Sequence, residues 1–137
     1  MSTLSSQHKL TRFGLKSTPA RRAVLDIIGK KNRPLDVTEI NVNLHKRQFR
    51  IDRVTVYRTL DRLVKHNLIK RIEFHEGKFR YEKVGEDHHH LVCEKCGRIS
   101  DIGRCPVVTL EKSIYSLQHF LVKRHALEFF GLCKNCH

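Results

Sequence analysis

The segment HHHLVCEKCG, which begins at His88, holds three histidines and two cysteines within ten positions. Imidazole nitrogens and thiolate sulfurs are ligands that zinc and other transition metals favour. If the segment is a strand, its side chains alternate between two faces, and His88 and His90 then share one face. His89 shares the other face with Asp87 and Cys93. One ion cannot easily use all three histidines, so the alternation predicts two different metal sites placed back to back.

Four of the five cysteines form two CxxC pairs, Cys93 with Cys96 and Cys133 with Cys136, and Cys105 is left over. In an intracellular chain such pairs indicate metal binding before they indicate disulfides. The two CxxC turns can meet and hold Zn²⁺ tetrahedrally through four thiolates, which leaves no ligand position open for catalysis. The alternative, two reduced redox pairs, lacks the βαβ context of a thioredoxin-like protein.

Positive charge is concentrated in the first part of the chain. Residues 1–83 hold 20 of the 27 Lys and Arg but only 8 of the 14 Asp and Glu, so they carry nearly all of the net charge of +13. A basic domain can meet nucleic acid or an anionic membrane surface, and a solvated surface without a partner is the simpler alternative. No stretch approaches the roughly 20 apolar residues of a membrane-spanning helix. The N-terminus also lacks the apolar region of a secretory signal, so we expect a cytoplasmic protein with no membrane partner.

The basic part has the pattern of a winged helix-turn-helix. Thr18 can cap a first helix that begins with Pro19, and Asp36 and Asp52 can cap two more. Asn67 suits a left-handed end to the third helix. Apolar alternation on both sides of the turn HEGK then predicts a β-hairpin. The predicted inward stripes of the three helices are Val24, Leu25, Ile28; Val37, Ile40, Leu44; and Val56, Leu60, Leu63.

In such a module the third helix enters the major groove of DNA. Arginine pairs with guanine edges, while Thr and Tyr reach phosphates or thymine methyl groups. The outward side of this helix carries Arg53, Thr55, Tyr57, Arg58 and Arg62. The basic residues that flank the helix and the hairpin, and that can hold the DNA backbone, are Arg50, Lys70, Arg71, Lys78 and Arg80. A small helical bundle with a charged face remains the alternative.

A helix and strands are expected between the two CxxC pairs. The segment PVVTLEKSIYSLQHFL predicts a helix that starts at Pro106, and HALEFFGLC predicts a strand that Gly131 breaks. The apolar stripe of this helix is predicted to face inward. It consists of Val107, Leu110, Ile114, Leu117 and Leu121.

Five segments of the chain resemble the ferric uptake regulator family of bacterial metal-dependent repressors, and they follow the order in which that family has them. They are LKSTPARRAVLDII, RVTVYRTLDRLVKHNLI, FRYE, DHHHLVCEKCG and RHALEFFGLCKNC. The resemblance runs over nearly the whole chain. It implies an α+β protein with a winged helix-turn-helix DNA-binding domain over residues 1–83. Residues 84–137 then form a small α/β dimerisation domain with the four-cysteine zinc site.

The resemblance also implies roles for single residues. Tyr57 and Arg58 match DNA contacts of the recognition helix, and Lys16 matches a minor-groove contact; Arg21 completes our predicted DNA-binding set. The regulatory metal ligands that match are Glu82, His88, His90 and Asp101. The ligands that match a second metal site are Asp87, His89 and His125. Simpler roles remain open for some of these residues: Asp101 can solvate a turn, His125 can be a core histidine, and Glu82 can pair with a basic neighbour.

Two departures from the family pattern concern metal ligands. Pro34 stands where many members have a histidine, and His75 in the hairpin turn is a candidate substitute for the regulatory site. Zinc-sensing relatives often lack that histidine, which favours Zn²⁺ over Fe²⁺ as the sensed ion, with Mn²⁺ as a third choice. Val108 stands at the usual glutamate of the second site, so we expect that site to be weak unless Glu111 or Cys105 compensates.

The resulting hypothesis is a homodimeric, metal-responsive repressor of metal-uptake genes that binds a palindromic operator in double-stranded DNA. Three alternatives remain open. The first is a peroxide sensor that uses iron or manganese on the same scaffold. The second is a small metallohydrolase that uses the histidine cluster, and the third is a zinc-ribbon nucleic-acid binder that does not respond to metal.

Overall fold

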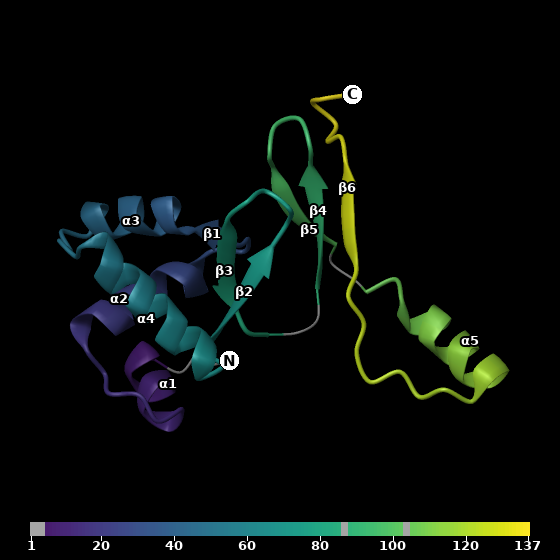
Figure 1. Cartoon of the computed structure of the whole chain (residues 1–137), viewed down its shortest axis with the longest axis horizontal. Helices are drawn as coiled ribbons and strands as arrows, with labels where there is room; N and C mark the ends of the chain where they lie inside the picture. Colours follow the sequence, from purple (N-terminus) through teal and green to yellow (C-terminus); the bar gives the residue numbers. More distant parts are fainter. Residues whose placement is uncertain (1–4, 86–87, 103–104) are drawn as a thin grey trace. The chain divides into compact units, whose positions relative to one another are not determined.

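The computed structural model describes residues 5–85, 88–102 and 105–137. The chain divides into two compact units, Met1–Gly85 and Glu86–His137 (Figure 1). None of the helices formed by the described residues combines the length and the apolar character that a bilayer crossing needs.

The described residues of the first unit, 5–85, form four helices: α1 (Ser6–Arg12), α2 (Pro19–Lys30), α3 (Val37–Lys46) and α4 (Arg53–Lys65). The three predicted caps are confirmed. Thr18 accepts a hydrogen bond from the backbone N–H of Arg21 at 3.3 Å, and Asp36 and Asp52 accept equivalent bonds at 2.8 Å. Helix α1 was not predicted from the sequence because it is short and buries only Leu10, so it has no apolar periodicity.

The core of this unit is formed by the predicted stripes of α2, α3 and α4, which are all buried, the least so Val37 at 6% exposure. Helix α4 is followed by Asn67 with φ of 59°, so the predicted left-handed end is confirmed. Burial of Val56, Leu60 and Leu63 fixes the rotation of α4 about its axis. The remaining face of α4 is therefore turned to solvent.

A three-stranded sheet completes the unit, in the order β1-β3-β2. It consists of β1 (Leu35–Asp36), β2 (Ile69–Glu73) and β3 (Phe79–Lys83), and β2 and β3 form the predicted hairpin. Tyr81 faces the core, whereas the Phe79 ring is 46% exposed, with the Arg71 guanidinium 4.5 Å above its centroid.

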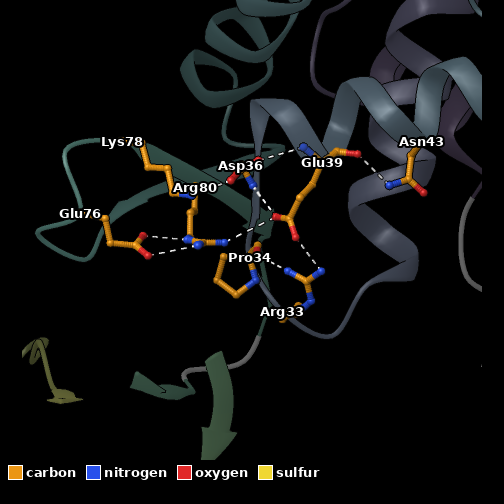
Figure 2. A network of polar contacts seen from close by, with 8 residues as sticks. All are labelled: Arg33, Pro34, Asp36, Glu39, Asn43, Glu76, Lys78 and Arg80. Atoms are coloured by element: carbon orange, nitrogen blue, oxygen red, sulfur yellow. Dashed lines mark hydrogen bonds and ion pairs between the residues drawn. The ribbon is translucent and has the colours of Figure 1, made fainter. Parts of the chain in front are cut away.

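A network of charges fastens the hairpin to the start of α3 (Figure 2). Arg80 donates to both carboxylate oxygens of Glu76, at 2.8 and 3.1 Å, and lies 3.5 Å from the Glu39 carboxylate. Lys78 Nζ meets Asp36 Oδ2 at 2.8 Å. The prediction that Arg80 holds the DNA backbone is therefore wrong: its side chain is 8% exposed and committed to two carboxylates.

The second unit contains a sheet of order β5-β4-β6, with β4 (His89–Cys93), β5 (Ile99–Ile102) and β6 (Glu128–Gly131). Strand β4 runs antiparallel to β5 and parallel to β6. The sequence predicted strands between the two CxxC pairs but did not locate β5, and Gly131 is the last residue of β6.

Helix α5 (Val108–Gln118) lies between β5 and β6 in the sequence, and its predicted inward stripe is wrong. No residue of the helix is buried, and Leu110 and Leu117 are 57% and 77% exposed. The helix begins two residues after Pro106 and ends before Leu121. The stripe thus exists as a pattern, but the described residues of the chain do not bury it.

Acid is expected to destabilise the first unit through Glu76. The hydrogen bond from Arg80 lowers the pKa of this carboxyl below its ordinary value of 4.5. A group with a lowered folded-state pKa contributes stability that is present above its unfolded pKa and lost as the pH falls through its folded pKa. Glu76→Gln should therefore lower Tm near neutral pH and flatten the fall of Tm between about pH 5 and pH 3. Circular dichroism melts check this, with the exposed Glu73→Gln as control; equal slopes for wild type and Glu76→Gln would contradict it.

Candidate metal centres and nucleic-acid interface

The four paired cysteines come together at one end of the second sheet. Cys93 ends β4 and Cys133 follows β6, so the parallel pairing of these strands brings the two CxxC turns side by side. Each turn is closed by a backbone bond, from Gly97 N to Cys93 O at 2.9 Å and from Cys136 N to Cys133 O at 2.8 Å. The four sulfur atoms lie within 4.8 Å of one another.

The electrostatics of this cluster favour a divalent cation. The backbone N–H groups of Cys96 and Cys133 lower the pKa of Cys93 to about 6. The side-chain hydrogen bond with Cys133 raises the pKa of Cys136 to about 12. Four thiols so close together therefore cannot all ionise easily by themselves. Sulfur ligands of a tetrahedral Zn²⁺ lie about 3.8 Å apart, and Cys96 Sγ and Cys133 Sγ are 3.8 Å apart. The donor set and its spacing fit a structural zinc ion.

A second cluster lies on one face of β4 and contains His89, Cys105 and His125. Their donor atoms are separated by 3.1 Å (His89 Nε2 to Cys105 Sγ), 3.4 Å (Cys105 Sγ to His125 Nε2) and 3.0 Å (between the two Nε2 atoms). Glu111 Oε1 lies 2.6 Å from His125 Nδ1, so this carboxylate meets the ring on its other nitrogen. Asp87, which was also predicted here, lies outside the described residues. The sequence suggested Cys105 only as one of two possible compensating residues.

The neighbouring histidines occupy the opposite face, as alternation requires. The rings of His88 and His90 meet edge to face, with centroids 4.9 Å apart. His90 pairs with Asp101 across β4 and β5, and its Nε2 lies 3.6 Å from Asp101 Oδ1. The second unit thus brings together three of the four predicted regulatory ligands.

The remaining regulatory candidates belong to the first unit. Glu82 is a residue of β3, 5% exposed, with its carboxylate 3.6 Å from the Lys70 ammonium. His75 lies in the hairpin turn with φ of 59°. Near Pro34, the Arg33 guanidinium pairs with Glu39 at 2.7 Å (Figure 2). Ion pairs with Glu39 therefore lie close to Pro34.

The exposed face of α4 has the composition of a nucleic-acid interface. Arg53, Arg58, Arg62 and Tyr57 are exposed, and Tyr57 is 43% accessible. A cleft of about 440 Å³ lies between this face and the hairpin, with Arg53 and Tyr57 among the residues of one wall.

Other predicted DNA contacts already have partners within the unit. Thr55 donates its hydroxyl to Asp52 at 2.7 Å, which ties it to the helix cap. Arg21 donates to the carbonyl oxygen of Lys16 at 2.8 Å, and the Lys16 side chain is exposed ahead of α2. This bond keeps the segment before α2 close to its first turn.

A winged-helix unit with an exposed basic helix, followed by a unit with grouped cysteines and histidines, defines a metal-binding transcription regulator. The sequence model of the ferric uptake regulator family matches residues 12–130. The chain belongs to that family. It is therefore a metal-responsive, DNA-binding regulator of a dimeric family and not an enzyme, which removes the metallohydrolase alternative.

Individual relatives agree with this assignment. The chain is 30% identical to a ferric uptake regulation protein of Bordetella parapertussis, over 97% of both chains. It is 28% identical to the peroxide operon regulator of Bacillus subtilis, over 93% of this chain and 88% of that one. The solved structure of the Vibrio cholerae ferric uptake regulator has a TM-score of 0.80 and 25% identity, covering 93% of this chain and 98% of that one.

Loss of one cysteine should remove the structural ion. The wild-type chain should keep roughly one zinc ion per chain after mild chelation. Cys136→Ser leaves three thiolates for an ion that needs four ligands, so this variant should lose the ion. Elemental analysis after dialysis measures this, and far-ultraviolet circular dichroism reports the accompanying loss of strand structure. Cys105→Ser is the matched control and should keep the chelation-resistant ion. A Cys136→Ser protein with undiminished zinc would show that the four sulfurs do not form the site.

Proposed function

We propose that the chain is a homodimeric repressor of metal-uptake genes that binds a palindromic operator when a divalent metal occupies a regulatory site. The observation that carries this proposal is the grouping of His88, which directly precedes β4, with His90 of β4 and Asp101 of β5. Imidazole and carboxylate donors suit Zn²⁺, Fe²⁺ and Mn²⁺. This face begins a few residues after the hairpin of the DNA-binding unit.

Glu82 is the ligand that we propose the DNA-binding unit contributes. Its carboxylate is buried and already faces one cation, the Lys70 ammonium. Only five residues separate Glu82 from His88 in the chain, so an ion bound to both would restrain the connection between the units. Metal that binds the DNA-competent arrangement more tightly than other arrangements shifts the population towards it. Affinity for DNA and affinity for metal then rise together, because coupling is reciprocal.

In this proposal, the two α4 helices of a dimer enter successive major grooves, which accounts for a palindromic operator. Arg53, Arg58 and Arg62 are exposed on the face of α4 opposite its buried stripe. A bidentate arginine–guanine pair supplies about 1–3 kcal/mol of discrimination between bases. Tyr57 on the same face can reach the backbone or a thymine methyl group.

We propose that a second copy of the chain covers the exposed apolar side chains of α5 and β6. All four residues of β6 are exposed, including Phe129 and Phe130, and α5 presents Leu110 and Leu117. Exposed apolar groups of this extent mark association surfaces.

Zinc is the ion that we propose is sensed, with Fe²⁺ as the second choice and Mn²⁺ as the third. Pro34 stands where many family members have a histidine. Ion pairs lie around it: Arg33 with Glu39, and Arg80 with Glu39 and Glu76. His75 in the hairpin turn is a possible substitute ligand. Similarity to the Bacillus subtilis peroxide operon regulator supports peroxide sensing through iron or manganese as a second candidate function.

Metal dependence of DNA binding tests the main proposal. Protein that holds only the four-cysteine zinc should bind a palindromic duplex weakly, and Zn²⁺ should raise its affinity about 5- to 150-fold. His90→Ala should abolish the rise because it removes a central ligand, whereas the exposed His8→Ala on α1 should retain it. Fluorescence anisotropy under anaerobic conditions, at buffered free concentrations of Zn²⁺, Fe²⁺ and Mn²⁺, measures the effect.

Two outcomes would redirect the assignment. DNA affinity that is equal with and without added metal would overturn metal control and favour a zinc-ribbon nucleic-acid binder. Oxidation of His88 or His90, detected by mass spectrometry after iron loading and peroxide treatment, would favour the peroxide sensor.

Self-association through α5 has its own test. Leu117→Asp places a charge among apolar groups and should raise the dimer dissociation constant by about 100-fold, the size of effect expected at an interface hot spot. Ser116→Asp adds the same charge at the neighbouring exposed position and should have a much smaller effect. Sedimentation equilibrium measures both, and an unchanged dimer in Leu117→Asp would exclude this face.

A further inference from the structure

Three donor atoms converge at the site formed by His89, Cys105 and His125. His89 belongs to β4, Cys105 precedes α5, and His125 follows α5 before β6 begins. Their donor atoms are 3.0–3.4 Å apart. Two nitrogens and one sulfur from three separate segments thus surround one point.

These separations fit a tetrahedral metal. With zinc–nitrogen and zinc–sulfur bonds of about 2.05 and 2.3 Å, neighbouring ligand atoms lie about 3.3–3.6 Å apart. The observed separations are a few tenths of an ångström shorter, so a small outward shift of each side chain makes room for the ion. His89 is 5% exposed and the other two are half-buried, so the donors are already screened from water.

Glu111 sets the direction in which His125 can bind. A carboxylate accepts hydrogen bonds, so at 2.6 Å from Glu111 Oε1 the Nδ1 atom of His125 carries a proton and donates it. In the neutral ring, Nε2 then has a free lone pair. That nitrogen lies 3.4 Å from Cys105 Sγ and 3.0 Å from His89 Nε2. Glu111 is therefore a positioning residue, like the carboxylates that orient metal-bound histidines.

We propose that Cys105 is a thiolate ligand of a second metal ion, together with His89 and His125, and that Glu111 orients His125 without binding the ion. A sulfur donor in the ligand set favours Zn²⁺ over Mn²⁺, which prefers oxygen ligands, and Zn²⁺ also binds nitrogen and sulfur donors more tightly than Fe²⁺ does. Val108 at the usual glutamate position therefore does not leave the second site without ligands. The inference is independent of which ion the regulatory site senses.

The position of the ligands gives this ion a structural role. Cys105 and His125 flank α5 on its two sides, and α5 buries none of its own residues. An ion shared with His89 would fasten both ends of the α5 segment to β4. The site therefore fixes the helix that carries the exposed apolar stripe.

Cobalt(II) provides a direct probe of sulfur ligation. When full-length protein with zinc in its four-cysteine site is titrated with Co²⁺, a thiolate-to-cobalt charge-transfer band should appear in the near ultraviolet. The band should be absent in Cys105→Ser and His125→Ala, and present in His90→Ala. Glu111→Gln should keep the band but weaken cobalt binding about 10- to 100-fold, the usual effect of losing an orienting carboxylate. Excess Zn²⁺ should remove the band and excess Mn²⁺ should not.

A matched variant separates ligation from folding. Cys105→Asp replaces the thiolate by a carboxylate, so it should bind Co²⁺ with d–d absorption but without the charge-transfer band. Retained zinc and an unchanged circular dichroism spectrum show that each variant is folded. No band in the wild type, or a band that persists in Cys105→Ser, would overturn the proposal.

Discussion

The parallel pairing of β4 with β6 is the interaction on which the chemistry of the second unit depends. It places Cys93 opposite Gly131, two residues before Cys133, and so brings two CxxC turns that are distant in sequence into one cluster. The same pairing draws the segment before β6, with His125, beside His89. Two clusters of metal donors therefore rest on one set of backbone hydrogen bonds. Parallel strands need a long crossover, and in this chain the crossover is α5 with its flanking segments.

Strand alternation then separates ions that would otherwise compete for one run of histidines. His89 turns towards Cys105 and His125, whereas His90 turns towards Asp101 on the other face. A shift of the β4 register by one residue would exchange these faces and break both groups. The alternation thus gives neighbouring imidazoles different surroundings: His89 lies beside a sulfur atom, and His90 lies beside a carboxylate.

Local signals in the sequence were sufficient for the helix caps at Thr18, Asp36 and Asp52, because capping depends on residues three positions apart. They were also sufficient for the hairpin and for the alternation along β4. They failed for α1, which lacks periodicity, and for α5, whose apolar stripe is periodic but uncovered. Periodicity tells which residues share a face, but it does not tell whether the partner of that face is in the same chain. Cys105 was hard to assign because its neighbours, His89 and His125, are distant in sequence.

The charge network of the first unit limits where a sensed metal can act. Arg80 is held between Glu76 and Glu39, and Lys78 meets Asp36, so these ion pairs fasten the hairpin to α3 without the help of a metal. Burial of the α4 stripe likewise sets the orientation of the recognition face within its own unit. An ion is thus not needed to build the DNA-reading surface. In the proposed function, the metal therefore raises DNA affinity by restraining the two DNA-binding units of a dimer. Glu82 is the residue by which the first unit would bind the ion.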